Sequence, residues 1–461
     1  MGGVRESGEH NTALEAVILE AGCSHAALAR RVNELGRCQG VVSRYDKASV
    51  TRWLQGMTPR NRAPEFIAAA LGEWLGRPVT PVDFGFPAQP QRPVAARALI
   101  YREDVGETLH TLAELGSTDV SRRTLLGTVP FVATALMEPQ RQWLLWLVEE
   151  EQTPRLAAVA GGGLAARVRA MIDMFDEMDN KYGGGGVRAS IIHYLSTQLT
   201  PMLQQRSQSP HQRRLLFTSA AKLAAMAGWC SYDSADYGLA QRYMIQGLRL
   251  CAEGGDRVLG GQILAGLSHL ATSLGSPSEG VSLARAGVAT AKTAGSPLGL
   301  MRLHAMAARG HAALGDSRRA TASLRLASAA LDTSNGPDEE SPWVRFLDHH
   351  YLEAEAAQVH RDLGEATQAE RLATASVKAN GDRRRRQAIS RSVLATALLQ
   401  QDRLDEAVGT ASQALDLLGD VHSERSVQAL RDFRTRLAPL RMEPMVRDFE
   451  RKARPLLGTA A

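Results

Sequence analysis

The fold of this chain is decided by the stretch ARGHAALGDSRRATASLRLA, residues 308–327, in which small residues stand at positions 308, 320 and 327. The same spacing of twelve and then seven residues occurs five times, and the middle members follow one another at intervals of 40, 40, 49 and 38 residues (240 to 280, 320, 369 and 407). Seven residues make two helical turns, so the second and third members share one helix face. Twelve residues span the end of one helix, a turn and the start of the next. The pattern therefore predicts an array of closely packed antiparallel helix pairs. Its five sets are Gly228, Ala240, Gly247; Ser268, Gly280, Gly287; Ala308, Ala320, Ala327; Ala357, Ala369, Ser376; and Ala395, Ala407, Ala414.

This array resembles the tetratricopeptide repeat, a family that places small residues at these three positions of each unit. Gly315-Asp316 and Gly364-Glu365 fit the turn inside such a unit, and Asp402 holds that place in the last clear unit. The units are longer than the usual period of about 34 residues, and the family's aromatic positions are mostly missing. A polar insertion at 335–342 (NGPDEESP) explains the interval of 49 residues. The resemblance implies a helical-repeat solenoid.

The composition favours an all-α protein. Of the 461 residues, 44% are hydrophobic and 5% are aromatic, which suits long amphipathic helices better than strands. No run of about 20 apolar residues is present, so we expect no membrane span. The four cysteines form no CxxC pair, which argues against a zinc site or a disulfide framework and favours a cytoplasmic location.

The N-terminal part of the chain has the pattern of a helix-turn-helix domain. We expect a first helix at 12–20, a second at 26–35 ended by Gly36, a third at 47–55 that begins after Asp46, and a fourth from about residue 65 to 75. Between residues 24 and 62 the sequence has eight basic and two acidic side chains, a difference of six, although the whole chain has a net charge of only +5. Positive charge is thus concentrated where a DNA backbone would need it.

This domain resembles the Cro/repressor-like (XRE) family through Leu28-Ala29, through SVTRWLQG at 49–56, and through Pro59. The loop between the second and third helices, residues 37–45, is longer than the family's tight turn. The resemblance implies that the third helix enters the major groove of DNA, whereas Trp53 is expected in the core because it shares a helix face with Val50. The base-reading candidates are Lys47, Ser49 and Arg52. The phosphate-contact candidates are Arg30, Arg31, Arg44, Arg60 and Arg62. The alternative is that these are ordinary solvated charges.

The sequence divides into five segments. Residues 1–11 are expected to be disordered, 12–76 form the helix-turn-helix domain, 77–97 a proline-rich linker, 98–205 a helical middle region, and 206–461 the repeat array with a charged helical cap after residue 423. Phe84 and Phe86 are expected to pin the linker to a neighbouring surface.

Three charged or glycine-rich stretches have competing interpretations. The acidic residues at 173, 176, 177 and 179 suggest a solvated helix face more than a metal site. The four glycines at 183–186 suggest a flexible connection more than a phosphate-binding loop. The basic run at 382–386 stands at a helix start, where positive charge is unfavourable. We interpret it as a solvated loop, and a contact with an acidic partner is the alternative.

The order of these segments resembles that of actinobacterial, streptomycete-type regulators of differentiation and antibiotic production. The segments RRTLL (122–126), FDEMDNKYGGGGVR (175–188) and Tyr194-Leu195 look like parts of those regulators. The resemblance implies a cytoplasmic regulator, located at the nucleoid when bound to double-stranded DNA, and often a repressor of development or secondary metabolism. We expect a homodimer formed through the middle region or the array.

Two other functions remain open. The array could make the chain a receptor regulator that responds to a peptide, a small molecule or a protein effector. Alternatively, the chain could be an interaction scaffold whose DNA-binding head has degenerated. We expect no catalytic, cofactor or metal site, and hence no enzyme, because no nucleophile elbow, HExxH, phosphate loop or paired acid and base is evident. His349-His350 suggests helix surface or core.

Overall fold

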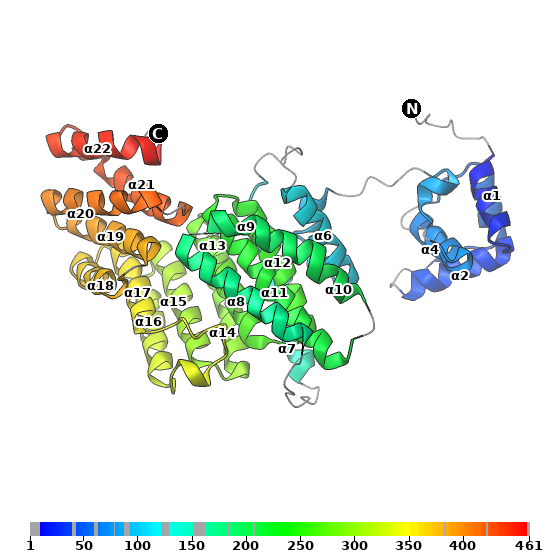
Figure 1. Cartoon of the computed structure of the whole chain (residues 1–461), viewed down its shortest axis with the longest axis horizontal. Helices are drawn as coiled ribbons and strands as arrows, with labels where there is room; N and C mark the ends of the chain where they lie inside the picture. The colour runs from blue at the N-terminus through cyan, green and yellow to red at the C-terminus, as the bar shows by residue number, and fades with distance from the viewer. Residues whose placement is uncertain are drawn as a thin grey trace. The chain divides into compact units, whose positions relative to one another are not determined.

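The computed structural model describes residues 10–38, 43–59, 63–77, 79–86, 93–120, 129–151, 163–182, 184–205, 208–381, 383–420 and 423–458. Within these ranges the chain is helical and contains no strand, which confirms the all-α fold class (Figure 1). The chain separates into two compact units, Met1–Arg92 and Pro93–Ala461.

The first unit is a small helical domain around one apolar core. Its helices are α1 (Thr12–Glu20), α2 (His25–Cys38), α3 (Lys47–Leu54) and α4 (Ala63–Leu75), followed by the 3₁₀ turn η1 (Pro81–Phe84). Helix α2 packs on both α3 and α4. The helices meet through fully buried side chains, among them Leu14, Leu28, Val50, Ile67 and Phe84. Trp53 also lies in this core, as expected. Helix α2 runs past Gly36, where we expected it to end.

The first unit extends beyond the boundaries expected from the sequence. We expected Asn11 to belong to the disordered terminus, but it is buried and forms the N-cap of α1. Its side-chain amide donates a hydrogen bond to the Phe84 carbonyl oxygen at 2.9 Å. Phe84 and Phe86 pack edge to face in the same core, with ring centroids 5.4 Å apart. The first part of the expected linker therefore belongs to this domain. Linker residues 78 and 87–92 lie outside the described part of the chain.

The second unit begins with the middle region, which packs directly on the array. Its helices are α5 (Val94–Arg97), α6 (Val105–Val120), α7 (Met137–Glu151), α8 (Leu164–Tyr182), α9 (Gly184–His193) and α10 (Thr200–Gln204); η2 (Ala133–Leu136) precedes α7, and the π-helical segment η3 (Tyr194–Leu199) precedes α10. Helices α6 and α7 pack against α12, and α8 and α9 against α11. One hydrophobic core spans the middle region and the first helix pairs. The middle region and the array are therefore one compact body.

Residues 95–103, which we call the strap, run from α5 into the connection before α6 and are fixed to this body by hydrogen bonds to their backbone. Arg242 of α12 donates to the Ala95 carbonyl oxygen. One turn further along α12, Gln246 donates to the carbonyl oxygens at 98 and 100, at 2.9 and 3.0 Å. After a second turn, Arg249 donates to those at 102 and 103, both at 2.6 Å. Polar side chains spaced along one helix thus satisfy the strap's backbone acceptors.

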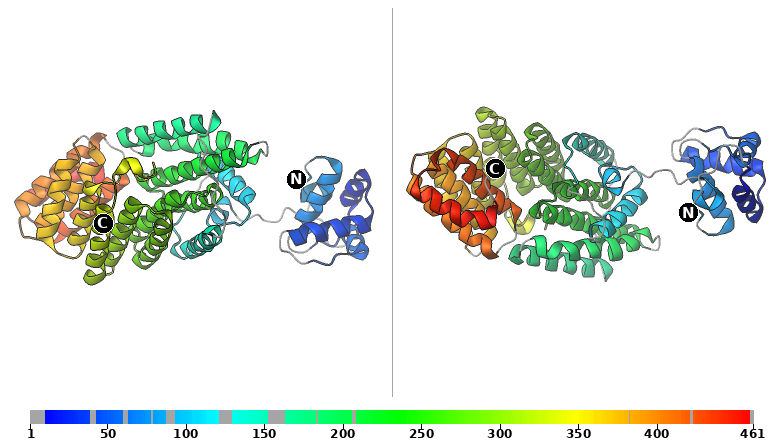
Figure 2. Two further views of the ribbon diagram at one scale, coloured as in Figure 1. Left: turned by 90° about the horizontal axis from the view of Figure 1, so that it is seen from below. Right: turned by 90° about the horizontal axis from the view of Figure 1, so that it is seen from above.

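The array consists of helix pairs in the positions that the small-residue ladder predicts. The pairs are α11 (Pro210–Asp233) with α12 (Tyr237–Gly254), α13 (Arg257–Ser273) with α14 (Pro277–Ala294), α15 (Pro297–Ala313) with α16 (Ser317–Asp332), α17 (His349–Asp362) with α18 (Ala366–Ala379), and α19 (Arg384–Leu399) with α20 (Leu404–Asp416). In every pair the first ladder residue lies on the first helix and the other two on the second. Figure 2 shows these helices side by side in both views.

The ladder residues are small because the paired helices touch there. A Cβ atom added to Gly280 of α14 would lie 2.2 Å from Thr272 Oγ1 of α13. Ser268 donates its hydroxyl to the Gly280 carbonyl oxygen at 2.7 Å. The turn inside each pair contains one residue with positive φ, five residues before the middle ladder position. These are Ala235, Gly275, Gly315, Gly364 and Asp402.

The insertion between the third and fourth pairs folds back onto the array. It contains the 3₁₀ turn η4 (Pro337–Glu339) and then Trp343, which is buried. The Trp343 indole N–H donates to Asp256 Oδ2, the N-cap residue of α13, at 2.6 Å. The insertion therefore contributes to the inner surface of the array.

The C-terminal segment forms a sixth helix pair. Helix α21 (Glu424–Leu437) and helix α22 (Pro444–Leu457) follow η5 (Leu417–Asp420), with η6 (Ala438–Leu440) between them. Phe433 and Phe449 pack edge to face at 5.8 Å in a core shared with α19 and α20. The expected helical cap is present.

The four-glycine stretch differs from its sequence interpretation. Helix α9 begins at Gly184, so the described glycines of this stretch are helical and do not form a flexible connection. A Cβ atom at Gly184 would lie 2.8 Å from the Cys230 Cα atom of α11. Glycine is required here because the two helix backbones approach closely.

Candidate functional site

The start of α3 is fixed by a reciprocal cap. Asp46 Oδ1 accepts hydrogen bonds from the Ser49 backbone N–H at 2.8 Å and from the Ser49 hydroxyl at 2.7 Å, and the Asp46 N–H donates to Ser49 Oγ at 3.3 Å. These bonds from Ser49 lower the pKa of Asp46. Ser49 is only 6% exposed. The Ser49 hydroxyl therefore stabilises the start of the helix. We had expected it to contact bases and had not foreseen this structural role.

One face of α3 is exposed, and it carries the other two base-reading candidates. Lys47 and Arg52 are exposed, together with Ala48 and Gln55, whereas Val50 and Trp53 face the core. Arg52 donates a hydrogen bond to Ser49 Oγ at 3.3 Å, which orients its side chain along the helix. The exposed face of this helix therefore consists of Lys47 and Arg52 with short or neutral neighbours.

The loop before α3 is anchored by Asn33 of α2, a residue that the sequence reasoning missed. Asn33 Oδ1 accepts from the Tyr45 N–H and the Ser43 hydroxyl, both at 2.9 Å, and Asn33 Nδ2 donates to the Tyr45 carbonyl oxygen at 2.7 Å. The Tyr45 ring packs edge-on against Trp53 at 5.1 Å. These contacts give the backbone a defined path at Tyr45, and therefore also at the nearby Arg44 and Lys47. The sequence signal was weak, because a helical asparagine has no fixed partner.

The phosphate candidates fall into three groups. Arg31 is bound to Glu73 at 2.8 and 3.0 Å and to Glu34 at 3.1 Å, and these carboxylates raise its pKa. Its charge is already compensated. Arg30 and Arg44 are exposed and, among the described residues, pair with no carboxylate. Arg60 and Arg62 lie outside the described residues.

Five exposed basic side chains of α2, α3 and the connection between them form no ion pair with a carboxylate in the part of the chain that the structure describes: Arg30, Arg37, Arg44, Lys47 and Arg52. Arg52 is near enough to Asp46 to lower the pKa of that carboxyl. Elsewhere on this unit, Arg77 is paired with Glu20 at 2.8 Å. Uncompensated surface cations create a positive field that attracts an anionic partner such as a nucleic-acid backbone. The arrangement can bind and orient a polyanion.

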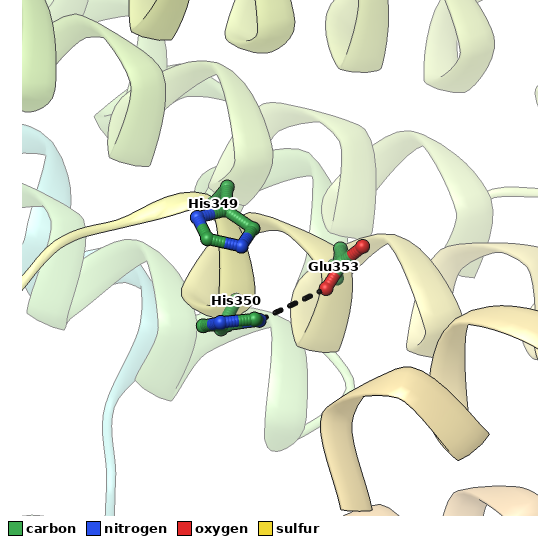
Figure 3. Close-up of side chains that lie close together, drawn as sticks. All are labelled: His349, His350 and Glu353. Carbon is green, nitrogen blue, oxygen red and sulfur yellow. Dashed lines mark hydrogen bonds and ion pairs between the residues drawn. The ribbon is translucent and has the colours of Figure 1, made fainter. Parts of the chain in front are cut away.

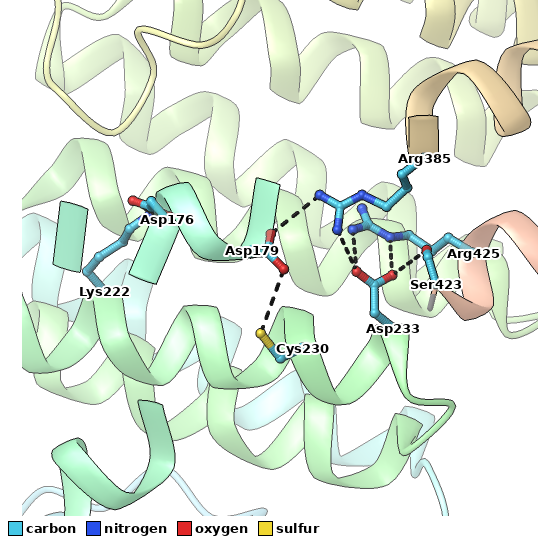
Figure 4. Close-up of polar contacts among 8 residues, drawn as sticks. All are labelled: Asp176, Asp179, Lys222, Cys230, Asp233, Arg385, Ser423 and Arg425. Carbon is cyan, nitrogen blue, oxygen red and sulfur yellow. Dashed lines mark hydrogen bonds and ion pairs between the residues drawn. The ribbon is translucent and has the colours of Figure 1, made fainter. Parts of the chain in front are cut away.

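A second polar cluster lies inside the array, at the end of α11. Asp233, whose side chain is 1% exposed, accepts from Arg425 at 2.6 and 2.8 Å, from Arg385 at 3.0 Å and from the Ser423 hydroxyl at 3.1 Å (Figure 4). Burial acts to raise the pKa of Asp233, but the two guanidinium groups and Ser423 hold it below the usual range. Arg385 also reaches Asp179 of α8 at 3.4 Å. This cluster joins the first array helix to α19 and to the segment that starts α21.

The acidic face of α8 is thus only partly solvated. Asp179 faces Arg385, and Asp176 accepts from Lys222 Nζ at 3.0 Å. Both contacts connect α8 to helices of the array, and Figure 4 shows the residues involved. The sequence suggested the acidic character of this helix but not its partners.

His349, His350 and Glu353 are the group in the described part of the chain whose side-chain atoms converge enough to hold a metal ion. The centroids of the two rings are 3.7 Å apart with the planes tilted by 44°, and His350 Nδ1 lies 3.3 Å from Glu353 Oε2 (Figure 3). All three residues belong to the first turns of α17, and His349 is exposed.

None of the helices in the described ranges is long and apolar enough to cross a lipid bilayer. Residues 14–87 are similar to a family model described as the SP15 N-terminal domain. The matched range ends one residue after Phe86, in agreement with the extent of the first unit. A comparison of the whole chain with curated proteins finds no match.

Proposed function

We propose that the chain is a sequence-specific DNA-binding regulator of transcription in which α3 enters the major groove. The observation that carries this proposal is the exposed face of α3, where Lys47 and Arg52 point away from the core and pair with no carboxylate of the described residues. Lysine and arginine suit the O6 and N7 acceptors of guanine. The exposed Arg30 of α2 and Arg44 of the connection before α3 would supply phosphate contacts, which position the helix on the duplex.

The regulator acts as a homodimer. A helix of eight residues, Lys47–Leu54, reads few base pairs, and two symmetric copies are the usual way to reach adequate specificity. The middle region or the array supplies the contact between copies. The resemblance to streptomycete-type regulators supports a cytoplasmic repressor of development or secondary metabolism, with no enzymatic activity.

The proposal is tested by capturing fragments of genomic DNA with the purified full-length protein at near-physiological salt. The double variant Lys47→Ala/Arg52→Ala serves as the control, because both side chains are exposed and their loss leaves the core intact. We expect a two-fold symmetric motif that is absent with the double variant. Equal recovery of fragments by both proteins, without a common motif, would show that α3 does not read sequence.

A further inference from the structure

The array forms a partly open cavity of about 990 Å³. Its walls come from the first helix of each pair, α11, α13, α15, α17, α19 and α21, with contributions from the end of α8 and from Trp343 of the insertion. The Asp233 cluster connects the first of these helices with the last two. Small-molecule sites in proteins have volumes of about 300–1,000 Å³. This cavity lies at the top of that range.

The wall of the cavity has an excess of positive charge. Ten basic and five acidic side chains line it, which is an excess of five. The basic ones are Lys222, Arg302, Arg309, Arg345, Arg361, Arg383, Arg385, Arg386, Arg425 and Arg436, and the acidic ones are Asp176, Asp179, Glu355, Asp362 and Asp432. Ion pairs within the wall, or with Asp233 behind it, compensate half of the basic groups. Arg302, Arg383, Arg386 and Arg436 pair with no carboxylate of the described residues.

Arg302 is the most buried of these unpaired cations. It is 8% exposed and donates to Gln262 Oε1, yet its own Nε and the Gln262 amide nitrogen have no hydrogen-bond partner in the described structure. Arg309 also has an unpartnered Nε, although its terminal nitrogen pairs with Glu355 at 3.1 Å. These unsatisfied groups are all donors. A buried cation that lacks a counter-charge, next to spare donors, is costly unless a ligand supplies acceptors and negative charge.

Arg386 provides a second unpaired guanidinium in the cavity wall, and both it and Arg302 act electrostatically on Tyr351. Arg386 belongs to the basic run at 382–386, which we interpreted from the sequence as a solvated loop. In the structure it instead lies in the first turn of α19 and is half-buried. Burial and the neighbouring Arg383 lower the pKa of Arg386, and Tyr351 and Asp348 offset only part of this effect. An anion in the cavity would relieve this repulsion.

The cavity also offers flat apolar faces beside the cations. The Arg302 guanidinium lies 5.8 Å from the Trp229 ring centroid and 5.6 Å from that of Phe346, and both rings line the cavity. Guanidinium groups bind phosphate through paired N–H donors, and aromatic rings stack on planar groups. We propose that this cavity binds a phosphorylated small molecule of about nucleotide size, with its phosphates at Arg302 and Arg386 and its planar part against the aromatic rings. This site does not depend on DNA binding by the first unit.

An acidic peptide would share the negative charge but fits the cavity less well. The cavity volume of about 990 Å³ is that of a small-molecule site, and guanidinium groups bind the clustered oxygens of phosphate through paired N–H donors. Carboxylates on flexible side chains also lose more conformational freedom on binding than phosphates that are close together. We therefore favour the compact phosphorylated ligand.

The test measures binding of defined probes to the full-length protein by isothermal titration calorimetry. The probes are guanosine and adenosine triphosphate, inorganic tripolyphosphate, adenosine without phosphate, and hexaglutamate. The variants are Arg302→Gln and Arg386→Gln. The matched control is Arg325→Gln, because Arg325 is exposed on α16, outside the cavity wall. Thermal melting of each ligand-free protein reports whether it is folded.

We expect saturable binding of at least one phosphorylated probe and none of adenosine. Arg302→Gln and Arg386→Gln should each weaken this binding by at least about tenfold, the loss of one charge-assisted hydrogen bond, with an unchanged or higher melting temperature. Arg325→Gln should bind like the wild type. Binding of hexaglutamate alone would overturn the assignment in favour of an acidic peptide. Absence of binding by every probe, or equal affinity in the wild type and the cavity variants, would also overturn it.

Discussion

Asp233 and Arg425, 192 residues apart in the sequence, form a two-point ion pair inside the array, with Oδ1 2.6 Å from Nε and Oδ2 2.8 Å from the terminal nitrogen. Arg385 donates to the same carboxylate. The pair therefore connects the end of the first array helix with helices of the last two pairs. In a solenoid each repeat normally contacts only its neighbours, so this contact adds a long-range restraint to the array.

The first prediction is that Asp233→Asn destabilises the array strongly. The substitution leaves two partly buried guanidinium groups without their carboxylate, and breaking a buried pair in this way costs about 3–5 kcal/mol in the free energy of unfolding. Urea denaturation followed by far-ultraviolet circular dichroism measures the change. The control is Glu138→Gln, which breaks the exposed Glu138–Arg141 pair and should have a much smaller effect. A similar decrease in the free energy of unfolding in the two variants would show that the Asp233 cluster stabilises the protein no more than an exposed ion pair does.

The second prediction concerns the pH dependence of the same pair. The pKa of Asp233 is lower in the folded protein than in the unfolded chain, where an aspartate has a pKa of about 3.9. Its stabilisation is therefore complete well above that value and is lost as the pH falls through the folded pKa. The difference in unfolding free energy between wild type and Asp233→Asn should be constant near neutral pH and should shrink below about pH 4. A difference that stays constant down to pH 3 would contradict this linkage.

The third prediction tests the small-residue ladder. Ala320 is fully buried between α15 and α16, whereas Ala322, two residues along the same helix, is exposed. Ala320→Leu should lower the free energy of unfolding by about 1–3 kcal/mol, because the extra carbon atoms have no space. Ala322→Leu should change it by less than about 0.5 kcal/mol. Equal effects at the two positions would mean that the ladder does not mark the helix contact.

The fourth prediction concerns the turn between α11 and α12. Ala235 has a φ angle of 62°, in a region that costs a residue with a Cβ atom about 1–2 kcal/mol. The corresponding turns at 275, 315 and 364 have glycine. Ala235→Gly should therefore raise the free energy of unfolding by about 0.5–1 kcal/mol, whereas Ala322→Gly, in the interior of a helix, should lower it by about 1 kcal/mol. A loss of stability in Ala235→Gly would contradict the strain at this turn.

The repeat array could be predicted from the sequence because its signal is local. The spacing of twelve and seven residues depends only on helix geometry and on the turn, and both reappear in every pair. The contacts of Asp233 could not be predicted, because their separations of 152 and 192 residues depend on how the repeats accumulate curvature. The contacts of the strap at 95–103 could not be predicted either, because its backbone accepts a hydrogen bond from Arg242, which is more than a hundred residues away in the sequence.

The candidate DNA-binding surface shows the same division between local and long-range signals. Asp46 was predicted as the N-cap of α3, and its spacing to Ser49 also fits a reciprocal cap, so the structural role of Ser49 could have been found. The pairing of Arg31 with Glu73, 42 residues further on, had no sequence signal. Charge counting alone cannot separate a compensated arginine from a free one.

The last prediction separates sequence reading from phosphate contact within the first unit. Arg52 lies on the exposed face of α3, whereas Arg44 lies in the loop that Asn33 anchors, and both are exposed. Arg52→Ala should weaken binding to the captured motif by about 1–3 kcal/mol and should leave binding to unrelated DNA nearly unchanged, because a base contact distinguishes sequences. Arg44→Ala should weaken both alike and should reduce the slope of log K against log salt by about one, the value for one phosphate. Fluorescence anisotropy with a motif duplex and a scrambled duplex, at several salt concentrations, measures both quantities. If the two variants lose affinity equally on the two duplexes, α3 is not the reading helix, and the long loop before it becomes the better candidate for the contact with bases.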